Sequence, residues 1–220
     1  MGFKSGIVAI VGKPNVGKST LLNRLVGQKV SIVSNKPQTT RRRVLGIAQG
    51  DGFQIAFIDT PGIHEPHTKL GRAMVESAKA ALAGVDLVLF VADASGRPGE
   101  LDKQIAALAV QDGRPVFAPI VACLNKMDLL KADQVVATVE AYTSLLATED
   151  VMLTTATAGH NVLELQRMLL ERLPEGRPMF PEDDYTDQSV RFMTAEIIRE
   201  KILNATRQEI PHSTAVSIES

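Results

Sequence analysis

The residues from position 12 to 19 constrain the fold of this 220-residue chain more than any other segment. They read GKPNVGKS and match the pattern G-x-x-x-x-G-K-[ST] in full. A continuous apolar run over residues 7–11 precedes them, which is typical of a strand buried on both faces of a parallel sheet. Leu21, Leu22 and Leu25 then fall on one side of a predicted helix over residues 19–25. The segment therefore predicts a strand, a glycine-rich turn and a helix that begins at the turn.

A turn of this kind can bind the phosphates of a nucleotide. Glycines at positions 12 and 17 let successive backbone N–H groups point inward, and the helix N-terminus adds partial positive charge. Lys18 would reach the β- and γ-phosphates, and the Ser19 hydroxyl would ligate Mg²⁺. The predicted nucleotide-binding residues of this phosphate loop are Gly12, Lys13, Pro14, Asn15, Val16, Gly17, Lys18, Ser19 and Thr20.

The rest of the chain alternates between strands and helices. Strands over residues 44–49 and 53–59 are so close in sequence that they form an antiparallel hairpin. The patterns predict further helices over residues 71–82, 100–111, 132–146 and 162–173, and further strands over 86–92, 116–124 and 151–155. This order predicts an α/β fold of the P-loop type, with a six-stranded, mostly parallel sheet, one antiparallel strand and helices on both faces.

Two further motifs follow predicted strands at the carboxyl edge of this sheet. Asp59 ends an apolar strand and can hold Mg²⁺ through a bound water, while the Gly62 N–H contacts a γ-phosphate. Asp128 can accept two hydrogen bonds from guanine N1–H and the 2-amino group, a donor pair that adenine lacks, so the chain is predicted to bind GTP rather than ATP. The residues of the two motifs are Asp59, Thr60, Pro61, Gly62 and Ile63, and Asn125, Lys126, Met127 and Asp128.

The three motifs together resemble those of the translation-factor-like GTPases, and the resemblance covers residues 7–173. It implies GTP or GDP and Mg²⁺ as ligands, and it places guanine recognition at Thr155 and Ala156, where Ser is usual in the position of Thr155. It also implies that a threonine after the first helix ligates Mg²⁺ when the γ-phosphate is present. Thr39 and Thr40 are the candidates, and analogy with related Thr-Thr-Arg loops favours Thr40. The predicted metal ligands are Ser19, Thr40 and Asp59.

The residue after Asp-x-x-Gly bears on catalysis. Ras-like enzymes place a glutamine there to orient the attacking water, whereas this chain has Ile63, so we expect slow hydrolysis that depends on another element. Asn15 resembles a residue that helps bind K⁺ in bacterial relatives, and K⁺ could neutralise charge between the β- and γ-phosphates. His64 is a weaker candidate for a base, since it follows Ile63 in a predicted loop. The predicted catalytic residues are Asn15, Lys18, Thr40 and Gly62.

Charge is distributed unevenly, although the formal net charge is only −1. Residues 1–50 contain nine Lys or Arg and no Asp or Glu, which predicts an anion-binding region. Arg41, Arg42 and Arg43 could contact RNA phosphates, or they could form a solvated strand edge, and the sequence leaves both interpretations open.

The character of the chain changes at residue 174. Residues 174–187 contain three prolines and a four-residue excess of acidic over basic side chains, which predicts a linker, and helical periodicity resumes over residues 189–208.

Three segments resemble bacterial GTPases of small-subunit ribosome assembly: the runs GKPNVGKSTLLNRLVGQKVSIVSNKPQTTRRRVLGI and DTPGIHEP, and the region after the linker. In those proteins this last region begins an RNA-binding KH-type domain. We expect a GTPase domain over residues 1–173, a linker over 174–187 and the incomplete start of an α+β KH-type domain over 188–220. No glycine follows Gly176, so the Gly-x-x-Gly loop of a KH domain is not in this sequence, and we expect a fragment of a longer protein.

The resemblance implies a GTP-hydrolysing switch that acts in small ribosomal subunit assembly, and it implies binding of the small ribosomal subunit and its RNA by the full-length protein. It implies a cytoplasmic monomer with peripheral association at the inner face of the membrane. The chain contains no apolar stretch of bilayer length, and its single cysteine, Cys123, fits a reducing compartment. Three alternatives stay open: a potassium-dependent GTPase of another task such as tRNA modification, an ATP-using P-loop enzyme such as a small kinase, and a non-catalytic nucleotide-gated scaffold.

Overall fold

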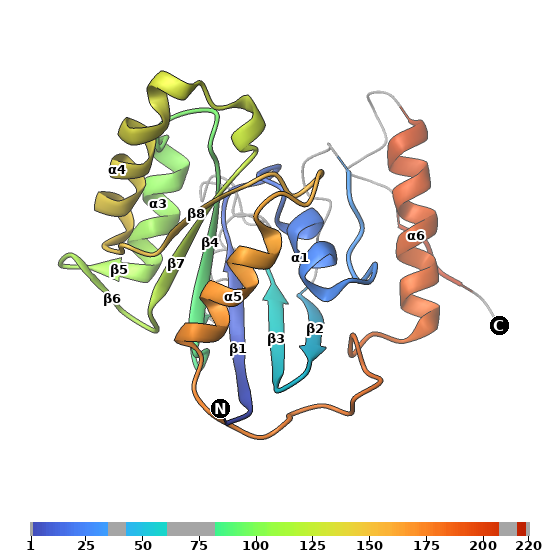
Figure 1. The fold of residues 1–220 in the computed structure, drawn as a ribbon. Helices are drawn as coiled ribbons and strands as arrows, with labels where there is room; N and C mark the ends of the chain where they lie inside the picture. Colours follow the sequence, from blue (N-terminus) through green and yellow to red (C-terminus); the bar gives the residue numbers. More distant parts are fainter. Residues whose placement is uncertain (1, 35–42, 61–81, 207–214, 219–220) are drawn as a thin grey trace.

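The computed structural model describes residues 2–34, 43–60, 82–206 and 215–218 (Figure 1). Six strands form one sheet in the order β2-β3-β1-β4-β7-β8. β2 pairs antiparallel with β3, and the other pairs of neighbouring strands in this sheet are parallel. The predicted P-loop fold is therefore confirmed. The strands are β1 (Lys4–Val11), β2 (Val44–Gly50), β3 (Phe53–Asp59), β4 (Leu87–Asp93), β7 (Ile120–Asn125) and β8 (Val151–Thr154).

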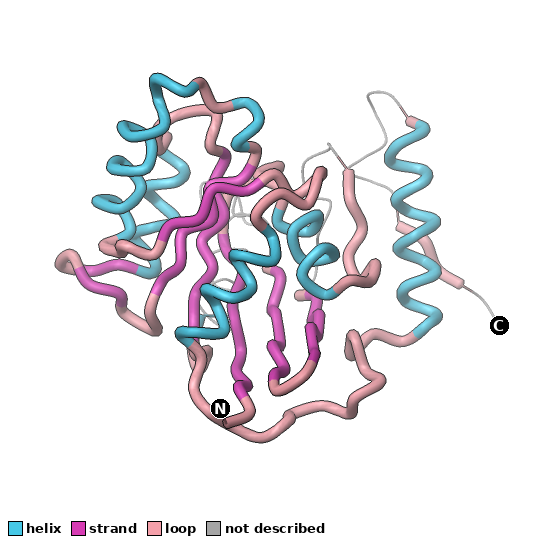
Figure 2. Tube along the Cα trace, in the orientation of Figure 1, coloured by secondary structure: helices cyan, strands magenta, loops and turns pink. Residues whose placement is uncertain are grey.

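Helices cover both faces of the sheet, as Figures 1 and 2 show. Alternate residues of β1 point to opposite faces, so Val8 and Ile10 pack into one buried cluster while Ala9 and Val11 pack into another. The first cluster includes residues of α1 (Lys18–Val26) and α5 (Val162–Arg172). The second includes residues of α3 (Glu100–Ala109) and α4 (Val135–Leu146). Burial of β1 on both faces explains its continuous apolar sequence.

The connection between α3 and β7 differs from the prediction. The strand expected over residues 116–124 begins only at Ile120, and Val116 and Phe117 are 47% and 43% exposed. The helix expected over residues 100–111 also ends earlier. The reason is a hairpin of β5 (Val110–Gln111) and β6 (Arg114–Pro115), whose turn residues 112 and 113 have φ angles of 50° and 70°. An Asp-Gly pair favours such a turn, and the turn takes the flanking residues out of the helix and the strand.

The remaining predicted elements lie close to their expected positions. The helix predicted over residues 132–146 begins with a 3-10 turn over Ala132–Gln134 and continues as α4. The helix predicted over residues 71–82 lies outside the described residues except for Leu82, which is helical and 1% exposed. Within the described ranges, no helix combines the length and the apolar character that crossing a bilayer requires.

Residues 174–187 run along the lower edge of the sheet in Figure 1 and contain no helix. The buried Gln54 side chain fixes them, because its Oε1 accepts hydrogen bonds from the backbone N–H groups of Met179 at 2.7 Å and Phe180 at 2.9 Å. Further along, the N–H of Ile47 in β2 donates to the carbonyl of Tyr185 at 2.9 Å. The segment is therefore held against β3 and β2 by backbone hydrogen bonds.

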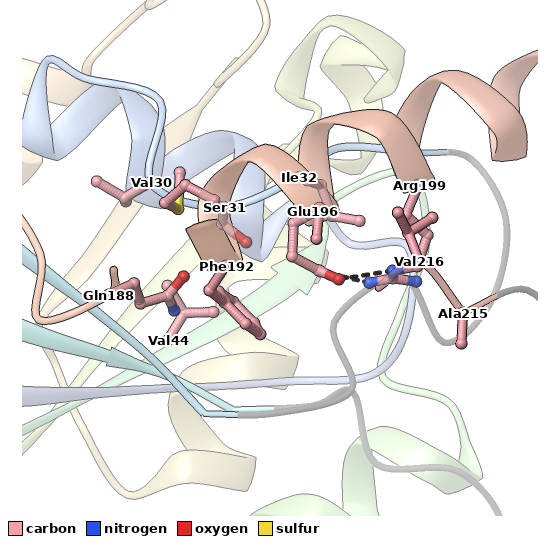
Figure 3. A pocket seen from close by; sticks show the side chains of 12 residues that line it. Val30, Ser31, Ile32, Val44, Gln188, Phe192, Glu196, Arg199, Ala215 and Val216 are labelled. Atoms are coloured by element: carbon pink, nitrogen blue, oxygen red, sulfur yellow. Dashed lines mark hydrogen bonds and ion pairs between the residues drawn. The ribbon is translucent and has the colours of Figure 1, made fainter. Parts of the chain in front are cut away.

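The last described helix, α6 (Val190–Ala205), packs against the segment that follows α1. Glu200 is 7% exposed, forms an ion pair with Lys29 and accepts a hydrogen bond from the N–H of Val33 at 3.3 Å. A cavity of about 270 Å³ lies beside these contacts, with Phe192 and Ile32 among its lining residues (Figure 3). The helix predicted over residues 189–208 thus contacts the segment after α1 at residues 29–33.

Candidate nucleotide-binding site

The phosphate loop lies between β1 and α1, and its two motif glycines have backbone conformations that few other residues adopt. Gly12 and Gly17 have φ angles of 150° and 99°. A Cβ atom at Gly12 would lie 2.1 Å from the carbonyl oxygen of Val91, and one at Gly17 would lie 2.3 Å from the Asn125 side-chain nitrogen. Both positions therefore require glycine for conformation and for space. Asn15, at the outer part of the loop, also has a positive φ of 63°.

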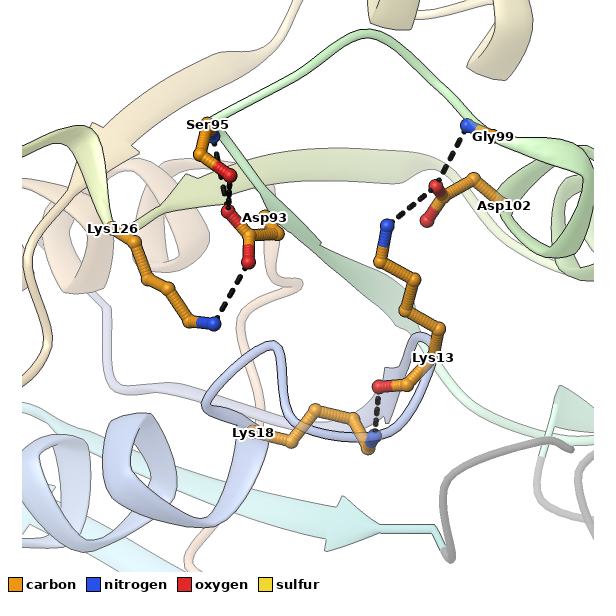
Figure 4. Close-up of polar contacts among 7 residues, drawn as sticks. All are labelled: Lys13, Lys18, Asp93, Ser95, Gly99, Asp102 and Lys126. Atoms are coloured by element: carbon orange, nitrogen blue, oxygen red, sulfur yellow. Dashed lines mark hydrogen bonds and ion pairs between the residues drawn. The ribbon is translucent and has the colours of Figure 1, made fainter. Parts of the chain in front are cut away.

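Lys18 is held inside the curve of this loop. Its Nζ donates hydrogen bonds to the carbonyl oxygens of Gly12 and Lys13, each at 2.9 Å. Figure 4 shows the bond to Lys13. The residue is 7% exposed, and burial lowers the pKa of its ammonium group to about 8, while the negative charge of Asp59 opposes that shift. A buried ammonium group in the first turn of a helix is suited to an anionic ligand.

Ser19 and Asp59 form the polar pair beside Lys18. The Ser19 hydroxyl donates to Asp59 Oδ2 at 3.0 Å, and Asp59 is fully buried at the end of β3. Burial raises the pKa of Asp59 to about 6, whereas Lys18 and hydrogen bonds from Ser19 and Ser31 lower it. Its other oxygen, Oδ1, forms no hydrogen bond with any described residue. A carboxylate with a free oxygen beside a hydroxyl is the hard donor set that Mg²⁺ prefers, so these residues fit that ion.

Asn125, at the end of β7, joins three parts of the site. Its Nδ2 donates to the carbonyl of Val16 in the phosphate loop at 2.7 Å. Its Oδ1 accepts from the N–H of Ala156 at 2.9 Å and from the Thr154 hydroxyl at 3.1 Å. The predicted base motif and the predicted phosphate loop are therefore brought together by one buried side chain.

Asp128 and Thr155 also meet, because the Thr155 hydroxyl donates to Asp128 Oδ1 at 3.1 Å. Asp128 lies in the short 3-10 turn Met127–Leu129, which follows Lys126 in a left-handed conformation with φ of 64°. This contact leaves lone pairs of the carboxylate for a further donor.

Asp93, at the end of β4, pairs with the base motif in the structure. Lys126 Nζ lies 2.7 Å from Asp93 Oδ2, and Ser95 donates to the other oxygen from its hydroxyl and its N–H (Figure 4). Burial alone would raise the pKa of Asp93, but the hydrogen bonds from Lys126 and Ser95 outweigh burial and lower it. Its position at the end of a predicted strand could have indicated this role, because in the structure it is in register with Asn125 at the end of the neighbouring strand.

Arg24, in the last turn of α1, was not predicted. Its Nε donates to the carbonyl of Ala156 at 3.2 Å and its Nη2 to the carbonyl of Thr157 at 2.6 Å. The arginine therefore fixes the loop after β8, which contains the residues that the resemblance connects with guanine. No spacing in the sequence indicated this contact, since it joins residues more than 130 positions apart.

Several predicted site residues lie outside the described residues. They are Thr39, Thr40, Arg41, Arg42, Pro61, Gly62, Ile63 and His64. Their proposed roles in metal binding, γ-phosphate contact and catalysis stay predictions. Arg43 is described and is exposed just before β2.

The comparisons with known proteins agree with this geometry. A family model described as 50S ribosome-binding GTPase matches residues 7–126, more than half of the chain. A solved structure of Era, in complex with MgGDPNP and nucleotides 1506–1542 of 16S ribosomal RNA, is 44% identical with a TM-score of 0.87. The match covers 96% of this chain and 70% of that one. The chain belongs to the Era family of GTPases.

A second Era structure, a point variant from Aquifex aeolicus bound to GDP.AlF4⁻, is 43% identical with a TM-score of 0.87, and covers 96% of this chain and 71% of that one. The FeoB G-domain from Methanococcus jannaschii is 23% identical with a TM-score of 0.56, covers 77% of this chain and 98% of that one, and supports the fold alone. Membership of the Era family confirms the predicted GTPase, and it gives no support to an ATP-using enzyme or a non-catalytic scaffold.

Proposed function

We propose that this Era-family GTPase is a nucleotide-dependent switch that binds ribosomal RNA and acts in small ribosomal subunit assembly. The observation that carries the proposal is the connected network in which Asn125 joins the phosphate loop to the base motif. The Era relative that was solved with MgGDPNP and a 16S ribosomal RNA segment supports the choice of nucleotide, metal and RNA. A potassium-dependent GTPase of another task receives no support from these relatives.

In this proposal each described motif binds one part of the nucleotide. Asp128 accepts hydrogen bonds from guanine N1–H and the 2-amino group, and the backbone near Ala156 binds guanine O6. The phosphate loop and Lys18 bind the β- and γ-phosphates. Ser19 and Asp59 hold Mg²⁺, which neutralises phosphate charge when bound. The fully buried Asp59, one oxygen of which forms no hydrogen bond with the described residues, supports this role.

The catalytic part of the proposal concerns Thr40, Gly62, Ile63 and Asn15. Thr40 completes the Mg²⁺ site when the γ-phosphate is present, and the Gly62 N–H contacts that phosphate. Because Ile63 cannot orient water, hydrolysis is slow without an activator. Asn15 helps to bind K⁺ near the β- and γ-phosphates, and its exposed position in the phosphate loop leaves it accessible to an ion. An equal hydrolysis rate in sodium and in potassium would contradict the potassium site.

The proposal divides the chain into a GTPase domain over residues 1–173, a linker over 174–187 and the start of a KH-type domain over 188–220. The contacts of Glu200 with residues 29–33 support communication between α6 and the nucleotide-binding half. We also propose a cytoplasmic monomer that associates peripherally with the membrane. Sedimentation would test the monomer, and flotation with anionic vesicles would test the membrane association.

The main experiment measures nucleotide preference on this chain and RNA binding on a chain that carries the whole KH-type domain. We expect GTP to compete with a fluorescent GDP analogue far better than ATP does. We also expect an RNA with the sequence of nucleotides 1506–1542 to crosslink more strongly with GDPNP than with GDP. Tighter ATP than GTP binding would contradict the nucleotide assignment, and nucleotide-independent crosslinking would contradict the switch.

A further inference from the structure

Lys13 belongs to the phosphate loop, but its side chain points away from Lys18. Its Nζ lies 2.9 Å from Asp102 Oδ2, in the first turn of α3 (Figure 4). The Lys13 side chain is 29% exposed and that of Asp102 is fully buried. A buried carboxylate is costly unless it is paired, so this contact holds the lysine strongly.

Asp102 is itself fixed in place. The same Oδ2 accepts a hydrogen bond from the N–H of Gly99 at 3.0 Å, and its position in the first turn of α3 is favourable for a negative charge. Tyr142 of α4, also fully buried, lies close by: burial raises the pKa of its hydroxyl, and the negative charge of Asp102 adds to that shift. The carboxylate is therefore held through Oδ2, by Lys13 and by the backbone at the start of α3.

Lys13 is connected to Lys18 through its own backbone. The carbonyl oxygen of Lys13 is one of the two acceptors that hold Lys18 Nζ. The side chain of Lys13 thus connects this peptide to Asp102, while its carbonyl positions the ammonium group of Lys18. A continuous series of short contacts runs from α3 to the residue that binds phosphate in the proposed function.

We propose that Asp102 is a positioning residue for nucleotide binding: through Lys13 it fixes the peptide that presents Lys18 to the β- and γ-phosphates. The inference rests on the proposed role of the phosphate loop. It assigns Asp102 no contact with the nucleotide. The proposal predicts that loss of the Lys13–Asp102 pair lowers nucleotide affinity even in variants that fold normally, and that removing either residue has the same effect.

The test is a double-mutant cycle on the affinity for GDP, measured by displacement of a fluorescent GDP analogue. Asp102→Asn and Lys13→Met should each weaken GDP binding about tenfold, the size expected when one charge-assisted hydrogen bond is lost. The double variant should bind GDP no more weakly than the single variants, because each change breaks the same contact. Lys13→Arg, which keeps a cation that can reach the carboxylate, should bind GDP more tightly than Lys13→Met does.

Glu100→Gln is the matched control, since it makes a carboxyl-to-amide change in the same turn, where Glu100 forms an exposed pair with Lys103 at 3.8 Å. It should leave GDP affinity unchanged. Urea unfolding of each variant separates folding from binding, and if Asp102→Asn does not fold, the comparison of Lys13→Met with Lys13→Arg decides.

Unchanged GDP affinity in folded Lys13→Met, or additive effects in the cycle, would overturn the inference. Lys18→Ala distinguishes this failure from failure of the proposed function. If Lys18→Ala loses GDP binding while Lys13→Met keeps it, only the positioning role is wrong. If Lys18→Ala keeps GDP binding, the assignment of the phosphate loop is wrong.

Discussion

Replacing Asn125 by alanine should destabilise the fold and abolish nucleotide binding together. Asn125 is 3% exposed, and its amide contacts the carbonyl of Val16 and the N–H of Ala156. After the substitution neither backbone group keeps this partner, and both lie where the surrounding chain is buried. The Thr154 hydroxyl also loses its hydrogen bond to Asn125, but it keeps a second partner, because Cys123 Sγ lies 3.2 Å from it.

The size of the effect follows from these contacts. A buried polar group that loses its partner costs about 1–3 kcal/mol, so the two backbone groups together cost roughly 2–6 kcal/mol. This is a large part of the total stability of about 5–15 kcal/mol that is typical of a folded protein. With a urea dependence of about 2 kcal/mol per molar, the midpoint should fall by roughly 1–3 M.

The assay is urea unfolding followed by far-ultraviolet circular dichroism, without added nucleotide, and GDP titration of the same samples. Thr154→Val is the matched control, because it removes the third hydrogen bond of Asn125 and the contact with Cys123, leaves both backbone partners of Asn125 in place, and keeps the side-chain volume. It should cost about 1 kcal/mol. If Asn125→Ala unfolds at the same urea concentration as Thr154→Val, the reasoning from its backbone partners is refuted.

Three further predictions concern other residues of the described chain. Asp128→Asn should weaken GDP binding about 100-fold and shift the preference toward xanthine nucleotides, because a carboxylate that accepts two donors is lost; an unchanged preference for GTP over xanthosine triphosphate would disprove the base assignment. Arg24→Ala should weaken the binding of GDP and of IDP about equally, by about tenfold, because the loop at Ala156 would bind O6, which both bases carry. A loss of affinity for GDP alone in competition titrations would contradict this. Burial raises the pKa of Cys123 to about 12, so the folded state holds the thiol proton more tightly than the unfolded state, and this contribution to stability falls as pH rises above about 9. Its reaction with a disulfide reagent between pH 7 and pH 9 should therefore follow added urea rather than thiolate formation, and rapid reaction in buffer alone would refute the buried placement.

Local patterns predicted the parts of the fold that short-range interactions determine. The glycine positions of the phosphate loop, the apolar strand before it and the hairpin of β2 and β3 all depend on neighbours in sequence. The strand predicted over residues 116–124 was wrong because periodicity alone does not show where an apolar run leaves a sheet. There the Asp-Gly turn at residues 112–113 pairs its flanks with each other and delays β7 until Ile120.

The supporting residues of the site could not be predicted in this way. Asp93 meets Lys126 across 33 positions, Asp102 meets Lys13 across 89, and Arg24 meets Ala156 across 132. Each contact exists only after the parallel strands have aligned their carboxyl ends, which is a property of topology rather than of local sequence. The motifs therefore indicated which side chains bind nucleotide, whereas only the folded chain shows which side chains hold them.

The binding side chains are bonded to one another, and this affects how affinity should be interpreted. Lys18 bonds to two carbonyls, Ser19 to Asp59, and Thr155 to Asp128. A magnesium nucleotide must exchange some of these contacts for its own, so measured affinity is a difference between two sets of hydrogen bonds. Supporting residues such as Asp102 affect affinity without contacting the nucleotide. They fix the loops before binding and so reduce the entropy that is lost when the nucleotide binds. Loss of such a residue should therefore weaken binding without removing any contact to the nucleotide.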